Sequence, residues 1–158
     1  MRKKEKSWPE MVLVSACLLG IKCRYDGTSR SYRRLKELLK GKIPLPVCPE
    51  QLGGLTTPRP AAEISSGDGR EVLRGRARIY NVEGQDVTKN YLRGAKETMR
   101  IAHIYEAKEA IFQDKSPACG VEHIVKKEKV VKGKGVVTAA LEAQGIKVIA
   151  CAGWCSGI

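Results

Sequence analysis

The chain has 158 residues, of which 42% are hydrophobic. A chain of this length can bury about 70% of its unfolded surface, so it needs no disulfides to fold as one domain. No apolar run approaches the roughly 20 residues of a membrane-spanning helix. The basic N-terminal stretch is not followed by an uninterrupted apolar region, so we expect no secretory signal and a cytoplasmic protein. We therefore predict a basic extension at residues 1–10 and a single domain at 11–158.

The net charge is +12, from 29 Lys and Arg against 17 Asp and Glu. Such an excess can attract nucleic acid. However, the basic residues form scattered runs, and aromatic residues make up only 5% of the chain. A solvated lysine-rich surface explains the charge better than a nucleic-acid interface does.

The first half of the chain alternates short apolar runs with a helical segment. Met11–Ala16 is β-branched and predicts a buried strand, followed by a loop over Cys17–Arg30 with turn residues. Ser31–Lys40 places three leucines on one face and predicts a helix capped by its serine. Ile43–Val47 predicts a second strand, although its two prolines weaken that prediction. A short helical turn is expected after Cys48.

The second half continues the alternation. Glu71–Val87 predicts two short strands that could pair as a hairpin. Thr88–Lys108 has apolar residues at spacings of three and four and predicts a long helix capped by its threonine. Glu109–Gln113 predicts a strand and Asp114–Gly120 a loop. The lysine-rich segment Val121–Gly135 is expected to be irregular.

Val136–Gln144 predicts a last helix, with glycine immediately after it, and Ile146–Ala150 a last strand. Strands that alternate with helices are typical of a mainly parallel sheet. We therefore predict an α/β, three-layer, Rossmann-like fold with helices on both faces and a small β-hairpin insertion.

The chain has six cysteines and no Cys-x-x-Cys pair, which disfavours a zinc ribbon or a thioredoxin-like motif. Cys17 follows the first predicted strand, Cys48 follows the second, and Cys119 lies in the loop after Glu109–Gln113. The loops at the carboxyl ends of parallel strands share one edge of a sheet, where ligands bind. We therefore expect these three thiols to lie together.

Three thiolates are compatible with several sites. Zinc is one, with His103 or His123 as a fourth ligand. An iron–sulfur cluster with one open iron is another, and such an iron is a Lewis acid that accepts a soft sulfur atom. Reactive or merely buried thiols are the third.

Two residues beside these cysteines can carry protons. Glu50 lies two residues after Cys48, and a carboxylate in a partly dry pocket near a metal can have a raised pKa and act as acid or base. Ser116 lies three residues before Cys119. The alternatives are structural: Glu50 would complement a helix dipole, and Ser116 would cap a turn.

Several motifs resemble one bacterial family, long regarded as of unknown function, that includes the 2-thiouracil desulfurases (desulfidases). They are Ser15–Gly20 with Cys23–Gly27, Cys48-Pro49-Glu50 with Gly53-Gly54-Leu55 and Pro58-Arg59-Pro60, Gly84–Thr88, Gly94-Ala95, and Ser116–Gly120. The likeness covers nearly the whole chain, from about Met11 to about Gln144.

The resemblance implies a [4Fe–4S] cluster held by Cys17, Cys48 and Cys119, with its fourth iron open to the substrate's sulfur. It also implies acid–base work by Glu50 and a role for the hydroxyl of Ser116. The expected substrate is a small thiolated pyrimidine such as 2-thiouracil. A non-catalytic zinc or iron–sulfur protein, a protein acting on modified tRNA, and a sulfide donor are alternatives.

The other three cysteines stay outside that assignment. Cys23 lies in the same loop as Cys17, so it is a possible fourth ligand, although we expect it not to be one. Cys151 and Cys155 fall outside the family motifs and are read as buried thiols or a local pair.

Overall fold

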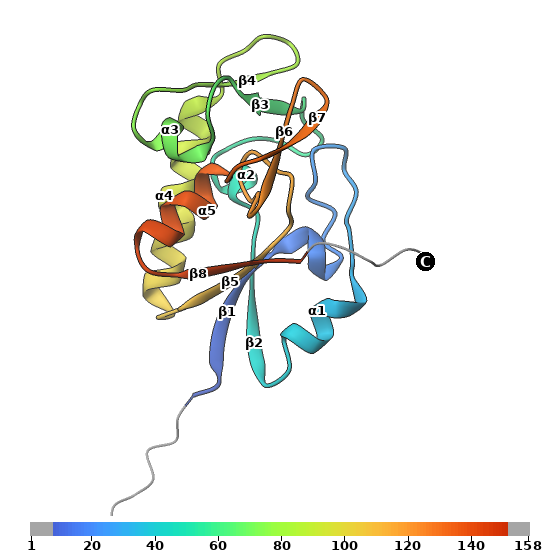
Figure 1. The fold of residues 1–158 in the computed structure, drawn as a ribbon. Coiled ribbons are helices and arrows are strands. Elements are labelled where there is room, and N and C mark those ends of the chain that lie inside the picture. The colour runs from blue at the N-terminus through green and yellow to red at the C-terminus, as the bar shows by residue number, and fades with distance from the viewer. Residues whose placement is uncertain (1–7, 152–158) are drawn as a thin grey trace, which may run out of the picture.

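The computed structural model describes residues 8–151, and a four-stranded parallel sheet forms its centre. The strands are β1 (Glu10–Ser15), β2 (Lys42–Val47), β5 (Glu109–Phe112) and β8 (Lys147–Ala150), in the order β2-β1-β5-β8 (Figure 1). All three neighbouring pairs are parallel. The four strands predicted for this sheet are therefore confirmed, within a residue or so at each end.

Alternation along the strands divides the core into two parts. Leu13 of β1 and Phe112 of β5 belong to one buried cluster, whereas Val12, Val14 and Ile111 belong to the other. Successive side chains of a strand point to opposite faces, so both faces of this sheet are buried. Layers therefore cover it on two sides, and the predicted three-layer α/β fold is confirmed.

Helices α4 (Thr88–Ile104) and α5 (Val136–Ala143) pack together and contribute to the cluster that contains Leu13. The other cluster includes Leu35 of α1 (Arg33–Leu38) and the short 3₁₀ helix η1 (Ala16–Leu19). Figure 1 shows α1 on one side of the sheet and α4 and α5 on the other. No helix within residues 8–151 is long and apolar enough to cross a membrane.

The two prolines of β2 are accommodated because, among residues 8–151, β2 is an edge strand that pairs with β1 alone. Proline cannot donate to a ladder of hydrogen bonds, so it is tolerated where one side of the strand has no partner. The prolines therefore indicated the strand's position at the sheet edge and not its absence.

Two antiparallel hairpins lie beyond the carboxyl end of the sheet (Figure 1). One pairs β3 (Ala62–Ile64) with β4 (Ile79–Asn81), and α3 (Gly69–Leu73) lies between them in sequence. Of the two strands predicted within Glu71–Val87, one is confirmed as β4. The other was wrong, because the segment's first residues finish α3 and β4 pairs with the earlier strand β3.

The second hairpin pairs β6 (His123–Lys126) with β7 (Lys129–Lys132). The prediction that Val121–Gly135 is irregular was wrong. The strands carry the apolar pairs Ile124-Val125 and Val130-Val131 next to lysines, and the two turn residues between the strands adopt positive φ. Ile124 is buried in the core, which gives the hairpin its support.

Neither predicted serine or threonine cap forms. Helix α1 begins after Tyr32, without a side-chain cap, and α4 begins after Val87. The Thr88 hydroxyl accepts the Ile79 amide at 2.8 Å and donates to Asp86 at 2.6 Å. Tertiary contacts with the loop before α4 therefore replace the local cap.

A close backbone approach fixes helix α2 (Pro49–Leu52) against α4. A Cβ atom on Gly94 would overlap the Pro49 carbonyl oxygen, and one on Gly53 would overlap the Asn90 carbonyl oxygen. The Asn90 amide also donates to the Gly53 carbonyl at 2.9 Å. Glycine on each helix therefore sets how deeply α2, which carries Glu50, seats against α4.

Replacing Gly94 with alanine should destabilise the fold. Alanine favours a helix by about 1 kcal/mol over glycine, but overlap with backbone that cannot yield costs about 1–3 kcal/mol and should prevail. Urea unfolding of Gly94→Ala measures the change. Lys96→Ala, at an exposed position of the same helix, should shift the unfolding free energy by less than about 0.5 kcal/mol. A Gly94→Ala variant as stable as wild type would contradict this packing.

Candidate functional site

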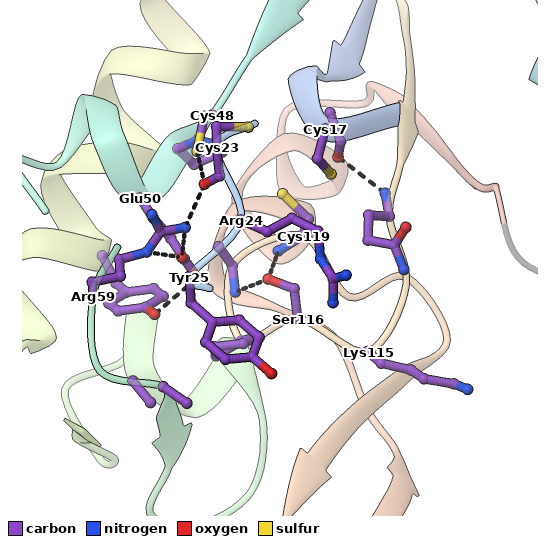
Figure 2. Close-up of a pocket in the computed structure, with 18 of the residues that line it drawn as sticks. Cys17, Cys23, Arg24, Tyr25, Cys48, Glu50, Arg59, Lys115, Ser116 and Cys119 are labelled. Atoms are coloured by element: carbon purple, nitrogen blue, oxygen red, sulfur yellow. Dashed lines mark hydrogen bonds and ion pairs between the residues drawn. The ribbon is translucent and has the colours of Figure 1, made fainter. Parts of the chain in front are cut away.

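A cavity of about 350 Å³ lies at the carboxyl edge of the parallel sheet. Its wall includes every residue predicted for the site, which are Cys17, Cys48, Cys119, Glu50 and Ser116, and Cys23 as well. Figure 2 shows the four cysteines around one space, with Glu50 and Ser116 beside it. The expected gathering of thiols from three separate loops is therefore present.

Each of the three predicted ligands follows its strand directly or through a short loop. Cys17 lies in η1, immediately after β1, and Cys48 is the residue between β2 and α2. Cys119 lies in the loop after β5, and its carbonyl oxygen accepts a hydrogen bond from Thr138 of α5 at 3.1 Å. Strand direction therefore determines where the thiols meet.

The thiols of Cys48 and Cys119 are held in protonated form by their surroundings. Burial raises the pKa of Cys119 well above the ordinary value of a thiol. Interaction with Cys23, followed by burial, does the same for Cys48. A metal centre must displace these protons to bind thiolates, so metal binding here would release protons.

Glu50 lies in the first turn of α2, but its carboxylate serves neighbours outside that helix. One oxygen accepts a hydrogen bond from Tyr91 at 2.9 Å, and the other accepts Nε of Arg59 at 2.6 Å. Arg59 is also ion-paired with Glu50, and both side chains are largely buried, with 5% and 12% exposed. The carboxylate is thus fixed at the cavity wall by two partners (Figure 2).

Arg59 also connects the carboxylate to the cysteine loop. Its Nη2 donates to the Cys23 carbonyl at 2.9 Å, and its backbone amide donates to the Tyr25 carbonyl at 2.8 Å. Burial alone would lower the pKa of Arg59, but the charge and hydrogen bond of Glu50 raise it overall. In the sequence, Arg59 stands within a family motif, and nothing there indicates its position at the centre of this network.

Ser116 caps a turn, which is the structural role considered for it from the sequence. Its Oγ accepts the backbone amides of Ala118 and Cys119, both at 3.1 Å. These bonds shape the loop that presents Cys119. Because the oxygen accepts in both bonds, the hydroxyl proton remains free to be donated into the cavity.

Asp114 is a further residue of the cavity wall that sequence reasoning missed. One of its oxygens accepts the amides of Val121, Glu122 and His123 at 2.8–3.0 Å, and the other contacts the His123 ring at 2.9 Å. It thus closes the loop that carries Ser116 and Cys119. The sequence did contain a signal for it, because Asp114 directly follows the predicted strand Glu109–Gln113, at the edge of the sheet where ligands bind.

The donor atoms do not form a site for a single zinc ion. Within residues 8–151, the only three Cys, His, Asp or Glu ligand atoms within 4.8 Å of one another belong to Asp114, Glu122 and His123. Neither His123 nor His103 lines the cavity. Tetrahedral zinc requires its ligand atoms close together, and no three cysteine sulfurs among residues 8–151 lie within 4.8 Å of one another. A cluster several ångströms across can bridge a wider separation.

The family model of the 2-thiouracil desulfurases matches residues 12–152. The chain belongs to the 2-thiouracil desulfurase family. The family resemblance noted in the sequence motifs is thereby confirmed.

Two relatives extend this result. An uncharacterised Bacillus subtilis protein, YbbK, is 41% identical over 142 residues, which cover 88% of this chain and 94% of YbbK. The solved structure of the [4Fe–4S]-dependent thiouracil desulfidase TudS is 33% identical and superposes with a TM-score of 0.75. That match covers 90% of this chain and 91% of TudS. The fold of the desulfidase is therefore also the fold of this family member.

Of the remaining two cysteines, Cys151 is not part of the cavity wall. Cys151 follows β8, is buried among the residues of the Val12 cluster, and does not line the cavity. Cys155 lies outside the described residues, as does most of the predicted extension at residues 1–10. The predicted local pair of Cys151 and Cys155 stays a prediction.

Replacing Asp114 with asparagine should destabilise the loop that carries Ser116 and Cys119. Burial alone would raise the pKa of Asp114, but its hydrogen bonds with His123, Val121 and Glu122 hold it below the usual value. Its contribution to stability is therefore complete above a pH of about 4 and is lost as the pH falls through the lower pKa of the folded state.

We expect Asp114→Asn to lower the unfolding free energy by about 1–3 kcal/mol at pH 7, and the difference from wild type to shrink as the pH falls below the ordinary aspartate pKa of about 4. Denaturant unfolding at several pH values measures both. Glu83→Gln, at an exposed carboxylate, is the control and should show neither effect. A deficit that persists unchanged in acid would contradict the role of the ionised carboxylate.

Proposed function

We propose that this chain removes sulfur from a thiolated pyrimidine such as 2-thiouracil. The reaction exchanges sulfur for oxygen without a net redox change: water supplies the oxygen, and sulfur leaves as hydrogen sulfide. Membership of the 2-thiouracil desulfurase family supports this activity, and the likeness to TudS supports its dependence on a [4Fe–4S] cluster. The observation that carries the proposal is the gathering of thiols and one anchored carboxylate in a single cavity.

The residues at the cavity fit such a cluster. Cys17, Cys48 and Cys119 would hold three of its irons, since they come from three loops that meet at one sheet edge. When bound, the cluster supplies an iron that acts as a Lewis acid toward the substrate's sulfur. A volume of about 350 Å³ lies in the range of small-molecule sites.

Glu50 is the group that moves a proton. It is the carboxylate beside the cysteines whose two oxygens are oriented by Arg59 and Tyr91. It would take a proton from the attacking water at a carboxylate oxygen and return it to the leaving sulfur or the ring. Arg59 compensates the negative charge of the carboxylate before it takes up that proton. Burial, and next to it the charge of Glu50, raises the pKa of Tyr91, so the Tyr91 hydroxyl stays protonated and donates a hydrogen bond.

Ser116 would orient the substrate. Its oxygen is engaged by two backbone amides, so its proton points away from the loop and is available to an acceptor atom of the pyrimidine. The same hydroxyl therefore positions both the Cys119 loop and the ring.

The alternatives from the sequence are less well supported. A zinc protein requires tighter donor spacing than the cavity cysteines have. A cluster with a purely structural role would not explain the cavity or the carboxylate that Arg59 and Tyr91 hold beside it. Action on modified tRNA rests on net charge alone. Retention on heparin at low salt, without activity on free 2-thiouracil, would favour it.

Glu50→Gln should keep the cluster and lose turnover. The amide preserves the side chain's size but cannot accept a proton, and loss of a general acid–base typically costs about 10²–10⁴-fold in rate. Iron and acid-labile sulfide per chain, absorbance near 400 nm and release of uracil from 2-thiouracil measure these effects after oxygen-free reconstitution.

Glu63→Gln is the matched control, because Glu63 lines the same cavity without contacting Arg59 or Tyr91. It should keep most of the activity. Equal losses in both variants would argue against a specific proton transfer by Glu50.

Cys48→Ala should lose the cluster and the activity together, since one of three ligands is removed. Cys151→Ala, which removes a buried thiol outside the cavity, should retain the iron content of wild type. Iron and sulfide analysis of the two variants makes the comparison. Unchanged cluster content in Cys48→Ala would remove Cys48 from the ligand set.

A further inference from the structure

The cavity holds one thiol more than the proposed ligand set uses. Cys23 is 2% exposed and lies in the cavity wall. Its thiol interacts with the thiols of both Cys17 and Cys48. Figure 2 shows Cys23 beside Cys48, with Cys17 across the same space.

The backbone around Cys23 is fixed so that this thiol faces the cavity. Its carbonyl accepts Nη2 of Arg59 at 2.9 Å and lies 3.7 Å from the Cys48 sulfur. Its amide donates to the Ile21 carbonyl at 2.8 Å. Arg59 therefore holds the catalytic carboxylate through Nε and Nη2, and the same Nη2 also holds the Cys23 loop.

The other anionic side chains of the cavity wall are already engaged. Glu50 is bound by Arg59 and Tyr91, Asp114 by three amides and His123, and Glu63 by the Lys127 amide. No histidine lines the cavity. Thiolates are the preferred ligands of iron–sulfur clusters, which are normally held by four of them. Cys23 is accordingly the strongest additional donor among the lining residues.

We infer that Cys23 is a reserve ligand: it binds the fourth iron when no substrate is present, and the substrate's sulfur displaces it. This inference rests on the proposed function. In the exchange, the bond from iron to Cys23 breaks as the bond to the substrate's sulfur forms. The released thiolate takes a proton from solvent, and no electron is transferred.

A reserve ligand reconciles two demands on the site. The iron must be reachable by a substrate's sulfur, yet an iron without a protein ligand is readily lost on oxidation. A neighbouring thiol satisfies both demands because it exchanges one sulfur donor for another. The three remaining cysteines would hold the cluster throughout.

The test compares wild type with Cys23→Ala and Cys23→Ser after oxygen-free reconstitution, with Cys151→Ala as the control at a buried cysteine outside the cavity. Each protein is oxidised with a small excess of ferricyanide in the absence of substrate. Electron paramagnetic resonance then reports the three-iron species, and iron analysis reports the loss. Both readouts are independent of turnover.

We expect both Cys23 variants to assemble the cluster and then lose one iron, while wild type and Cys151→Ala retain four. The variants should also show a lower KM for 2-thiouracil, because no internal ligand competes. Equal iron loss in wild type and the variants would overturn the inference while leaving the proposed function intact. Failure of Cys23→Ala to bind any cluster would make Cys23 a permanent ligand and overturn both. Wild-type protein that keeps its cluster but does not act on thiolated pyrimidines would refute the proposed function alone.

Discussion

The site depends on the common direction of β1, β2 and β5. Parallel strands end at the same edge of a sheet, so the residues that follow them meet there, whatever their separation in sequence. Cys17, Cys48 and Cys119 follow these strands, and the cavity opens where they meet. If one of these strands ran the other way, its cysteine would lie at the far edge of the sheet.

Around this edge, a few residues connect the segments that form the cavity wall. Arg59 binds Glu50 and the Cys23 carbonyl, so the carboxylate and the cysteine loop cannot move independently. Asp114 closes the loop of Ser116 and Cys119 on the opposite wall. Burial strengthens both anchors, because charged groups removed from water depend on their partners. A site that acts on a small molecule requires the side chains that would contact it to be held rigidly in position.

The glycines that allow α2 to pack closely against α4 also help to position the residues of the site. Gly94 lets the Pro49 carbonyl approach, and Tyr91, one turn earlier on α4, thereby reaches Glu50 on α2. Helix packing and acid–base geometry are thus coupled. Substitutions at this contact should therefore shift the Glu50 carboxylate as well as lower stability.

The sequence by itself determined the strands of the sheet, the helices on its faces and the convergence of three cysteines, because hydrophobic periodicity and the position of each cysteine after a strand are local features. It also identified Glu50 and Ser116 through the family motifs. Only the tertiary structure decided that the Glu50 carboxylate is bound by Arg59 and Tyr91, that Cys23 joins the other thiols, and that β3 pairs with β4 across α3. These contacts join segments that are distant in the sequence, and nothing in one segment's sequence predicts its partner. The side chains that bind Glu50 lie 9 and 41 residues from it, and packing in the folded chain, not a local sequence pattern, brings them together. The hairpin of β6 and β7 was missed for the same reason: its lysine-rich sequence becomes stable as strands only when Ile124 enters the core.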